Sequence, residues 1–440
     1  MPEIRPFRAL RYDRTTVADP ALVVAPPYEV VDDMERERLL ARHPANVVRL
    51  DRPTAEIGDE PDDRYRRAAR TIAAWRSDGT LHKDPHPSIY VYEQAWFEPG
   101  SGLARTRRGF FARVRLEAFG PGSEGPPNGR TRAGPSEDRY RLLRATGVNT
   151  SPAVGLYEDR DGVGRAVLDA LTDRPADLDI ADEDGILHRL WAVPADGDAA
   201  ADVAPLLAVA ARDPLAIADG LDRYEAALRY RDERRMSRSC EEDPAFDYIL
   251  MLLLDASTEP LTVPPVHRIV RGLGGDGLAR LLEGLDAWFD VRRDMSEPDL
   301  LSRFGPAARA AGGAGRFGSW TGSGGALLTA RRDAFEAYLP RGGAALRALD
   351  VTLLEIALER LAGIGPDAVA AGAVAYRTSA AGAIESVAAG SDGADAAFLL
   401  EPMPVASILA VAADRDRMPQ NSTALYPKAL TGLVINPHEW

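Results

Sequence analysis

Segments with strand-like and helix-like patterns alternate along most of this 440-residue chain. The strand-like segments include AVGLY at 153–157, LAIA at 215–218 and the apolar run YILMLLLDA at 248–256. Between them, apolar residues follow helical spacing at about 136–145, 201–211 and 221–235. Strands that alternate with helices in this way predict a fold of the α/β class.

The two ends of the chain follow the same pattern. In the first 120 residues we expect helices at about 32–42 and 64–78, a strand-like NVVRL at 46–50, and a long hairpin formed by 89–97 and 109–116. The Gly- and Pro-rich stretch 120–135 predicts a loop or linker. Since single cores rarely grow past roughly 250 to 300 residues, we expect an N-terminal and central region at 1–274 and a C-terminal α/β domain at 275–440.

The composition limits the kinds of molecule that we expect this protein to bind. The net charge of -14 argues against a broad surface for nucleic acid or anionic membrane, which requires clustered Lys and Arg. A single cysteine, Cys240, excludes an internal disulfide and a Cys-rich zinc site. The N-terminus lacks an export signal, and the apolar run 249–254 is too short to span a bilayer. We therefore expect a cytoplasmic protein that binds a small molecule; the sequence does not indicate its oligomeric state.

The turn at Asp219-Gly220 is the main candidate site. A strand-like run ends there and an amphipathic helix begins, so the amides of the helix start and Arg223, one turn in, face whatever lies beyond the strand. This arrangement favours an anion, but Asp222 places a carboxylate in the same first turn, where it would instead engage an ammonium or hydroxyl group. The alternative is that Asp219 is an N-cap and Asp222 its capping partner.

Two other segments supply candidates for acid–base and anion chemistry. The rigid turn Pro26-Pro27-Tyr28-Glu29 presents Glu29 as a general base, with a solvated surface glutamate as the alternative. Arg139, on the expected helix after the linker, is able to clamp a carboxylate or phosphate, although a solvated helix face accounts for it equally well.

The remaining candidates lie later in the chain. In VPPVHRIV, strand alternation predicts that one of His267 and Arg268 points inward and the other outward, and a buried neutral His is the commoner role. Near the C-terminus, Ser422, Thr423 and Lys428 lie in a polar loop, where Lys428 is the preferred phosphate contact and ordinary turn chemistry is the alternative.

Several segments resemble known motifs but do not indicate a functional site. GLGGDG at 272–277 does not end a strand at a mononucleotide turn, so it does not indicate a dinucleotide site. His82 and His86 are four residues apart, but Pro85 breaks the helix that such a metal site requires. The sequence predicts no metal site.

Segments in order along the chain resemble the domain-of-unknown-function 1015 family. They are PFRALRYD at 6–13, APPYEVV at 25–31, SEDRYRLLRAT at 136–146, AIADGLDRYEAALRYRDERR at 216–235, VHRIVRGL at 266–273 and RMPQNSTALYPKALTGLVI at 417–435. The family's Asp-Gly-His-His-Arg segment is in turn similar to the phosphate-binding turn of the ParB/sulfiredoxin superfamily, which includes ADP-dependent free-serine kinases.

This resemblance implies a fold, a cofactor and a reaction. The implied fold is a ParB/sulfiredoxin-like core with an additional C-terminal α/β domain that returns the 417–428 loop to the site. The implied activity is phosphoryl transfer from ADP or ATP, with Mg²⁺, to an amino-acid-like hydroxyl. Glu29 and Asp222 occupy the catalytic positions. The positions that contact substrate or phosphate are Tyr28, Arg139, Asp219, Gly220, Arg223, His267, Ser422, Thr423 and Lys428.

The chain departs from the family pattern at positions where chemistry is expected. The paired histidines are replaced by Leu221 and Asp222, the His and Glu of a Pro-His-Glu segment by Asn128 and Gly129, and two lysines by Ser136 and Asn421. Phosphoryl transfer depends on positioned positive charge and a base. Two further hypotheses therefore stay open: a repurposed biosynthetic enzyme that performs a cyclisation, condensation or elimination, and a catalytically inactive paralogue that binds a ligand.

Overall fold

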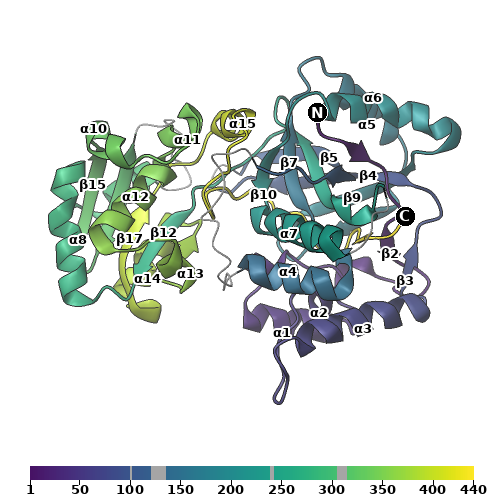
Figure 1. Ribbon diagram of the computed structural model, residues 1–440, viewed down its shortest axis with the longest axis horizontal. Coiled ribbons are helices and arrows are strands. Elements are labelled where there is room, and N and C mark those ends of the chain that lie inside the picture. The colour runs from purple at the N-terminus through teal and green to yellow at the C-terminus, as the bar shows by residue number, and fades with distance from the viewer. Residues whose placement is uncertain (100–101, 120–134, 238–241, 305–314) are drawn as a thin grey trace.

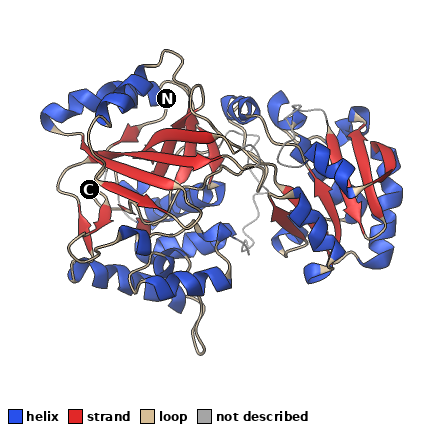
Figure 2. Ribbon diagram, turned by 180° about the vertical axis from the view of Figure 1, so that it is seen from behind, coloured by secondary structure: helices blue, strands red, loops and turns tan. Residues whose placement is uncertain are grey.

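The computed structural model describes residues 1–99, 102–119, 135–237, 242–304 and 315–440. The chain forms two halves, each built on its own large sheet (Figure 1). Figure 2 shows the same two halves from behind, with helices around each sheet. Both chain ends lie in the first half (Figure 1). The α/β class, with a further α/β unit in the C-terminal part, is confirmed.

The first sheet has eight described strands, with β1 pairing to β5 off the main path. In spatial order they are β10 (Ala216–Asp219), β7 (Ala153–Tyr157), β11 (Tyr248–Asp255), β5 (Ala104–Arg115), β4 (Ser88–Phe97), β9 (Leu187–Pro194) and β8 (Leu178–Ala181), with β1 at Ile4–Arg5. β7 and β11 are parallel, and the other paired strands run antiparallel. The hairpin expected at 89–116 is β4 and β5.

Every residue of the central strand β11 is buried, because both faces of this sheet are covered. Ile249, Met251 and Leu253 pack with four helices, whereas Leu250 and Leu252 pack with residues of the returning C-terminal segment. The four helices are α4 (Pro135–Thr146), α5 (Val163–Leu171), α6 (Ala200–Ala210) and α7 (Leu221–Ser237). A continuous apolar run is the pattern expected of a strand that is covered on both sides. This strand therefore anchors the neighbours that carry the candidate site.

The second sheet has six described strands, all antiparallel to their neighbours. In spatial order they are β13 (Phe289–Met295), β15 (Gly324–Ala330), β14 (Arg316–Thr321), β17 (Ala394–Leu399), β12 (His267–Arg271) and β16 (Val374–Arg377). Helices α8 (Gly274–Trp288) and α12 (Asp350–Ala362) pack on one face, and α9 (Glu297–Phe304) and α14 (Ala380–Ala388) pack on the other. Side chains on both faces of β12 are therefore buried.

Two short ladders complete the strands: β2 (Leu10–Tyr12) with β3 (Leu81–Lys83), and β6 (Val148–Asn149) with β18 (Asn436–Pro437). The helices of the first half are α1 Asp33–Arg42, α2 Val48–Asp51, α3 Asp63–Ser77, α4 Pro135–Thr146, α5 Val163–Leu171, α6 Ala200–Ala210 and α7 Leu221–Ser237, with the 3-10 helix η2 at Tyr28–Val30. The later helices are α8 Gly274–Trp288, α9 Glu297–Phe304, α10 Arg332–Phe335, α11 Ala344–Ala348, α12 Asp350–Ala362, α13 Pro366–Ala370, α14 Ala380–Ala388 and α15 Val405–Ala413.

The last residues of the chain return to the first half. The backbone of Ile435 pairs with Leu10, and Asn436 pairs with Asn149. The buried guanidinium of Arg113 donates to Asn436 Oδ1 at 2.6 Å and to the carbonyl oxygens of Pro437 and Glu439 at 2.5 and 2.8 Å. The first half is therefore completed by residues from both ends of the sequence.

The structure corrects two local expectations. NVVRL contains the helix α2 rather than a strand: Asn46 accepts from the Val48 amide at 3.0 Å and donates to the Leu22 carbonyl at 2.8 Å, which holds a turn there. The expected linker at 120–135 falls outside the described residues except for Pro135, the first residue of α4. No helix in the described part of the chain is long and apolar enough to cross a membrane.

Candidate functional site

Three segments far apart in the sequence meet at the start of α7. They contribute Tyr28 and Glu29 from η2, the residues 219–223 from the end of β10 and the first turn of α7, and Lys428 from the C-terminal segment. We call the side chains of Tyr28, Glu29, Asp219, Asp222, Arg223 and Lys428 the Glu29 cluster. Sequence analysis named every one of them, but not their mutual contacts.

Glu29 lies between two cations. Its Oε2 is 2.5 Å from Nη2 of Arg223, and its Oε1 is 3.5 Å from Nζ of Lys428. The Lys428 ammonium also contacts Asp219 Oδ2 at 2.5 Å. Arg223 is buried, whereas the side chains of Glu29 and Lys428 keep 28% and 22% of their surface exposed. Solvent therefore reaches the Glu29–Lys428 side of the cluster.

These contacts set the protonation states of the cluster. Burial alone would raise the pKa of Glu29, but Arg223 and Lys428 outweigh it and lower the pKa to about 2. Burial would lower the pKa of Lys428, and the carboxylates of Asp219 and Glu29 raise it instead. Glu29 is thus an ionised partner of two cations at neutral pH, although it stays partly in contact with solvent, as the surface-turn alternative expected.

Tyr28 links the cluster to a second buried arginine. Its ring lies between the guanidinium groups of Arg139, 3.8 Å from the ring centroid, and Arg223, at 5.3 Å. Its hydroxyl donates to Asp222. Burial and the negative charge of Asp222 raise the pKa of Tyr28 well above its ordinary value. Tyr28 therefore stays a neutral donor, and Asp222 accepts from it.

Asp51 connects Arg139 to Ser151, the hydrogen-bond partner of Arg223, and it was not predicted from the sequence as a site residue. It is buried, its Oδ1 accepts from Thr150 at 2.6 Å, and its carbonyl oxygen accepts from Arg139 at 2.6 Å. Its Oδ1 also accepts from Ser151 at 3.1 Å, and Ser151 in turn accepts from Arg223 Nε at 3.0 Å. The only sequence signal was its position after the apolar residues of α2, which is common for solvated aspartates as well.

Gly220 makes the close approach at the turn possible. Its φ is +74°, and a Cβ there would lie 2.6 Å from Nη1 of Arg223 and 3.0 Å from Cα of Ala153. The helix begins at Leu221, and Asp219 accepts from the Gly220 amide at 2.8 Å rather than from the first turn of the helix. The capping alternative is therefore wrong, because Asp219 binds Lys428 and Asp222 binds Tyr28.

The backbone around Lys428 is fixed by buried polar side chains from the first sheet. Gln94 donates to the Lys428 carbonyl at 2.9 Å, and Arg107 donates to the carbonyl oxygens of Tyr426, at 3.1 Å, and of Pro427. Lys428 is one of only two lysines in the chain, which otherwise uses arginine. Its placement beside Glu29 follows from these contacts rather than from a surface loop.

Three expected site residues lie elsewhere in the structure. His267 is fully buried in β12, where its Nδ1 accepts from the Leu400 amide at 3.1 Å, and burial lowers its pKa to about 4. Ser422 donates to the Pro419 carbonyl at 2.6 Å and so stabilises a turn, which is the ordinary turn chemistry that the alternative interpretation of this loop predicted. Within the described residues, no hydrogen bond or ion pair joins Ser422 or Thr423 to the Glu29 cluster.

The expectation that His267 and Arg268 face opposite environments is wrong, because both are buried, at 0% and 3% exposure. Helices cover both faces of the second sheet. Arg139 is also buried and ion-paired with Asp51 and Asp138, so a solvated helix face does not describe it. The altered positions Asn128 and Gly129 lie outside the described residues.

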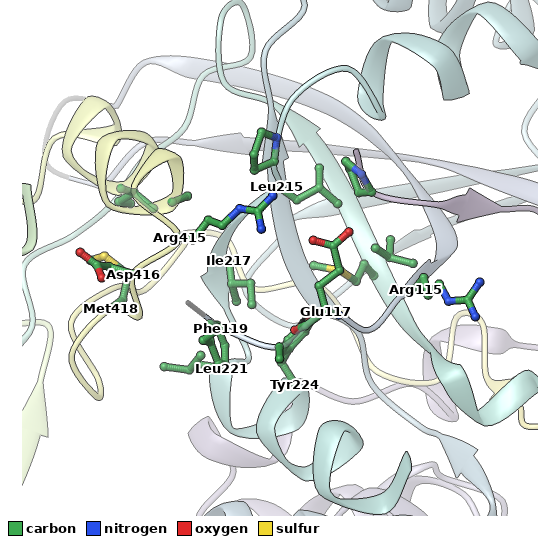
Figure 3. A pocket seen from close by; sticks show the side chains of 17 residues that line it. Arg115, Glu117, Phe119, Leu215, Ile217, Leu221, Tyr224, Arg415, Asp416 and Met418 are labelled. Atoms are coloured by element: carbon green, nitrogen blue, oxygen red, sulfur yellow. Dashed lines mark hydrogen bonds between the residues drawn. The ribbon is translucent and has the colours of Figure 1, made fainter. Parts of the chain in front are cut away.

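A cavity of about 100 Å³ lies between the first sheet and α15. Figure 3 shows side chains from both parts around it, among them Leu215, Ile217, Tyr224 and Met418. Leu221, the first residue of α7, also lines it, but Glu29, Arg223 and Lys428 do not. The charged groups of the Glu29 cluster therefore lie outside this cavity and are engaged in internal ion pairs.

Among the described residues, no group of three or more His, Cys, Asp and Glu side chains is arranged to hold a metal ion. The carboxylates of the cluster are instead matched to cations or to the Tyr28 hydroxyl.

Comparison with solved structures finds distant similarities. A free serine kinase variant in complex with ADP has a TM-score of 0.36 and 10% sequence identity, with 72% of this chain and 87% of that chain covered. A free serine kinase in complex with AMP has a TM-score of 0.31 and 10% identity, with 66% and 79% covered. A conserved hypothetical protein from Pyrococcus furiosus has a TM-score of 0.32 and 10% identity, with 66% and 82% covered.

A search of curated proteins finds no match. The sequence model described as a protein of unknown function (DUF1015) matches residues 4–352, which is most of the chain. That span includes η2, β10 and the first turn of α7, the segments that carry Glu29 and Arg223. On this match, the chain belongs to the DUF1015 family.

Proposed function

We propose that the Glu29 cluster is the active site of a small-molecule enzyme that transfers a phosphoryl group from ADP or ATP to the hydroxyl group of an amino-acid-like metabolite. The observation that carries the proposal is the position of Glu29 between Arg223 and Lys428, beside the start of α7. It places a carboxylate base and two cations at one helix N-terminus, the combination that phosphoryl transfer uses.

In the proposed mechanism, Glu29 holds the two cations in place until a ligand arrives. A phosphate group displaces Glu29 from Arg223 and Lys428 and gains the amides of the first turn of α7. Without its cationic partners, Glu29 has a pKa that rises from about 2 toward its ordinary value of 4.5 or above. The base is therefore activated only when the phosphate site is filled.

The freed Glu29 then accepts the proton of the substrate hydroxyl. The hydroxyl oxygen forms a bond to the transferred phosphorus, the bond from phosphorus to the bridging oxygen breaks, and the shortened nucleotide leaves. Arg223 and Lys428 stabilise the charge on the transferred group. Asp219, which Lys428 releases when it engages the phosphate, is the carboxylate that would hold a nucleotide-bound Mg²⁺, with phosphate oxygens supplying further ligands.

A second function is favoured by the charge of the cluster. The carboxylates of Glu29, Asp219 and Asp222 outnumber the two cations of Arg223 and Lys428, and a phosphate would add to the negative charge. A ligand that carries an ammonium or hydroxyl group and no phosphate suits this balance. The enzyme would then perform a cyclisation, condensation or elimination on an amino-acid-like metabolite, and an inactive ligand-binding paralogue would share the same chemistry.

Isothermal titration calorimetry with ADP and ATP, each with and without Mg²⁺, separates the two functions. Phosphoryl transfer predicts saturable, Mg²⁺-dependent binding of at least one nucleotide. Absence of binding under all four conditions contradicts it and leaves the second function.

The variant Asp222→His tests whether the turn is a phosphate cradle. Removal of this negative charge from the first turn should tighten nucleotide binding by roughly tenfold, since a like charge at close range opposes the phosphate. Tyr28→Phe is the matched control, because it breaks the same Tyr28–Asp222 hydrogen bond without removing a charge. Equal affinity of Asp222→His and the wild type counts against a phosphate at this turn.

A further inference from the structure

Arg268 is a buried cation without a carboxylate partner. It is the second residue of β12, the strand between β16 and β17, and only 3% of its surface is exposed. No Asp or Glu oxygen in the described part of the chain lies within 4.0 Å of its guanidinium group, and its two hydrogen bonds go to backbone carbonyl oxygens, those of Val266 and of Gln420 at 3.5 Å. Carbonyl oxygens satisfy donors but do not neutralise a charge.

The position is unusual for the rest of this chain. Arg107, Arg113, Arg139 and Arg223 are also buried, but Arg139 and Arg223 have carboxylates at 3.3 Å or less. Arg107 has no ion pair in the described structure, but it donates to the Gln94 side chain and to two backbone carbonyl oxygens. Arg113 has none, but the C-terminal segment closes over it and supplies three acceptors within 2.8 Å. Arg268 differs because only two of its five N–H groups have acceptors in the described structure.

The side chains around Arg268 reach the molecular surface. The Tyr376 ring lies 5.3 Å from the guanidinium carbon, and the side chain of Asn421 forms a hydrogen bond with the Tyr376 hydroxyl. Glu355 of α12 interacts electrostatically with Arg268 but forms no ion pair with it. Glu355 and Asn421 are exposed and Tyr376 is half-buried, so the guanidinium group lies one side chain below solvent.

A second cation extends the same region toward α7. Arg417 interacts electrostatically with Glu355 and forms an ion pair with Glu225 of α7 at 2.8 Å. The segment that begins at Arg417 therefore contacts Arg268 through Gln420, contacts α7, and ends with Lys428 in the Glu29 cluster.

We propose that Arg268 is the floor of a second ligand site, separate from the Glu29 cluster, which binds a compact oxyanion between β12, α12 and residues 417–421. The ligand group is a sulfate-like or phosphate-like dianion or a carboxylate, since the free N–H groups of a guanidinium suit two oxygens of such a group. Asn421 and Arg417 supply the further donors. The site does not depend on the proposed phosphoryl transfer.

Glu355 makes this site sensitive to pH. Desolvation of its carboxyl group raises the pKa of Glu355 to about 7, although the residue as a whole is exposed and Arg268 and Arg417 oppose the rise. The groups that face it are Arg268 and Tyr376 from the sheet and Arg417 from the C-terminal segment, with Glu225 paired to Arg417. Below pH 7 the neutral Glu355 leaves Arg268 uncompensated, so an oxyanion binds more tightly there than at pH 8.

The test uses the full chain and sulfate, which stays a dianion between pH 6 and 8. Sulfate binding is measured by titration calorimetry in the Lys428→Met variant, so that the Glu29 cluster does not contribute to the measured binding. We expect Arg268→Met to weaken sulfate binding by at least about tenfold, while Arg271→Met, on the same strand and paired with exposed Asp392, leaves it unchanged. Repeating the titration with acetate distinguishes a phosphate-like ligand from a carboxylate.

The variant Glu355→Gln provides a second test that leaves the sheet intact, because Glu355 lies on α12 and the substitution is nearly isosteric. In the parent protein, sulfate should bind roughly fivefold more tightly at pH 6 than at pH 8. In Glu355→Gln the ratio should fall to about one. Equal binding by Arg268→Met and its parent, or a pH ratio that Glu355→Gln leaves unchanged, overturns the proposal.

Discussion

The contacts of Glu29 in the folded chain change the interpretation of this residue. A glutamate in a Pro-Pro-Tyr-Glu turn is an ordinary surface residue by sequence, but Arg223 and Lys428 convert it into an ionised partner with a pKa of about 2. As a base, it is inactive until those cations are engaged elsewhere. The sequence indicated the residue and its chemistry; the two contacts that control it come from residues 194 and 399 positions away.

The Glu29→Gln variant should lower the free energy of unfolding at pH 7 by roughly 2 kcal/mol, because Arg223 loses its buried counter-charge. Since the pKa of Glu29 is lowered on folding from 4.5 to about 2, its stabilising effect is present above pH 4.5 and is lost as the pH falls toward 2. Urea denaturation as a function of pH measures both effects. Glu37→Gln, an exposed glutamate, is the control. A parallel pH dependence in Glu29→Gln and wild type contradicts the ion-pair assignment.

Gly220→Ala tests the turn that brings Arg223 to Glu29. The new methyl group meets Arg223 and Ala153 and also occupies a positive φ, so the expected cost is about 2 to 3 kcal/mol. Gly147→Ala isolates the backbone strain, since its φ is +65° and nothing lies within 4 Å of the added carbon. The excess of the first cost over the second is the packing contribution, and denaturation curves that coincide for the two variants exclude it.

At the scale of elements, Asp51 at the end of α2 joins three parts of the first half. It binds Arg139 of α4, Thr150 and Ser151 before β7, and the backbone amide of Tyr28 in η2 at 3.2 Å. Asp51→Ala should therefore lower the free energy of unfolding by about 3 to 5 kcal/mol, because it leaves Arg139 buried without one of its counter-charges.

The control for Asp51 is Asp33→Ala, which removes an exposed partner of Arg52 and should cost less than about 1 kcal/mol. Chemical denaturation monitored by far-UV circular dichroism measures both variants. A cost for Asp51→Ala as small as that for Asp33→Ala would show that Asp51 does not organise the site.

The elements that the sequence predicted best are those with long, regular patterns. The helix α7 and the hairpin of β4 and β5 follow directly from their apolar spacing, and both position the site. The helix α2 was not predicted, because it depends on the hydrogen bonds that Asn46 makes within the turn and to Leu22. The roles of Asp51 and Ser151 were not predicted, because they depend on hydrogen bonds between segments about 100 residues apart. The buried neutral role of His267 was predicted, but the burial of its neighbour Arg268 was not, because alternation along a single strand carries no information about a sheet covered on both faces.

At the scale of the whole molecule, the C-terminal segment is part of the first half. Ile435 is fully buried beside Leu10 and Val48 in the core around α1 to α3. Ile435→Ala should lower the free energy of unfolding of this half by about 2 to 4 kcal/mol, measured by urea denaturation of the full chain. Met236→Ala, at an 84% exposed position, should have little effect. Similar midpoints for the two variants contradict this role of the segment.

The return of this segment also explains why the site could not be assembled from the sequence. The chain leaves the first half after β11 and forms the second sheet. It then returns, so that Lys428 contacts Asp219 in the turn before α7, about two hundred residues earlier in the sequence. Local patterns predict the elements of both halves, but no local pattern predicts that pairing. The family resemblance suggested the same residues without giving their contacts.

The most direct measurement is the affinity of the full chain for ADP with Mg²⁺, by titration calorimetry, in the wild type and in Lys428→Met. The control is Lys83→Met, which alters the other lysine of the chain, held by Glu439 and the Trp440 carbonyl. If Arg223 and Lys428 receive a phosphate, Lys428→Met weakens binding by at least about tenfold and Lys83→Met does not. No binding by the wild type, or equal binding by all three proteins, contradicts the assignment of the Glu29 cluster as a phosphate site.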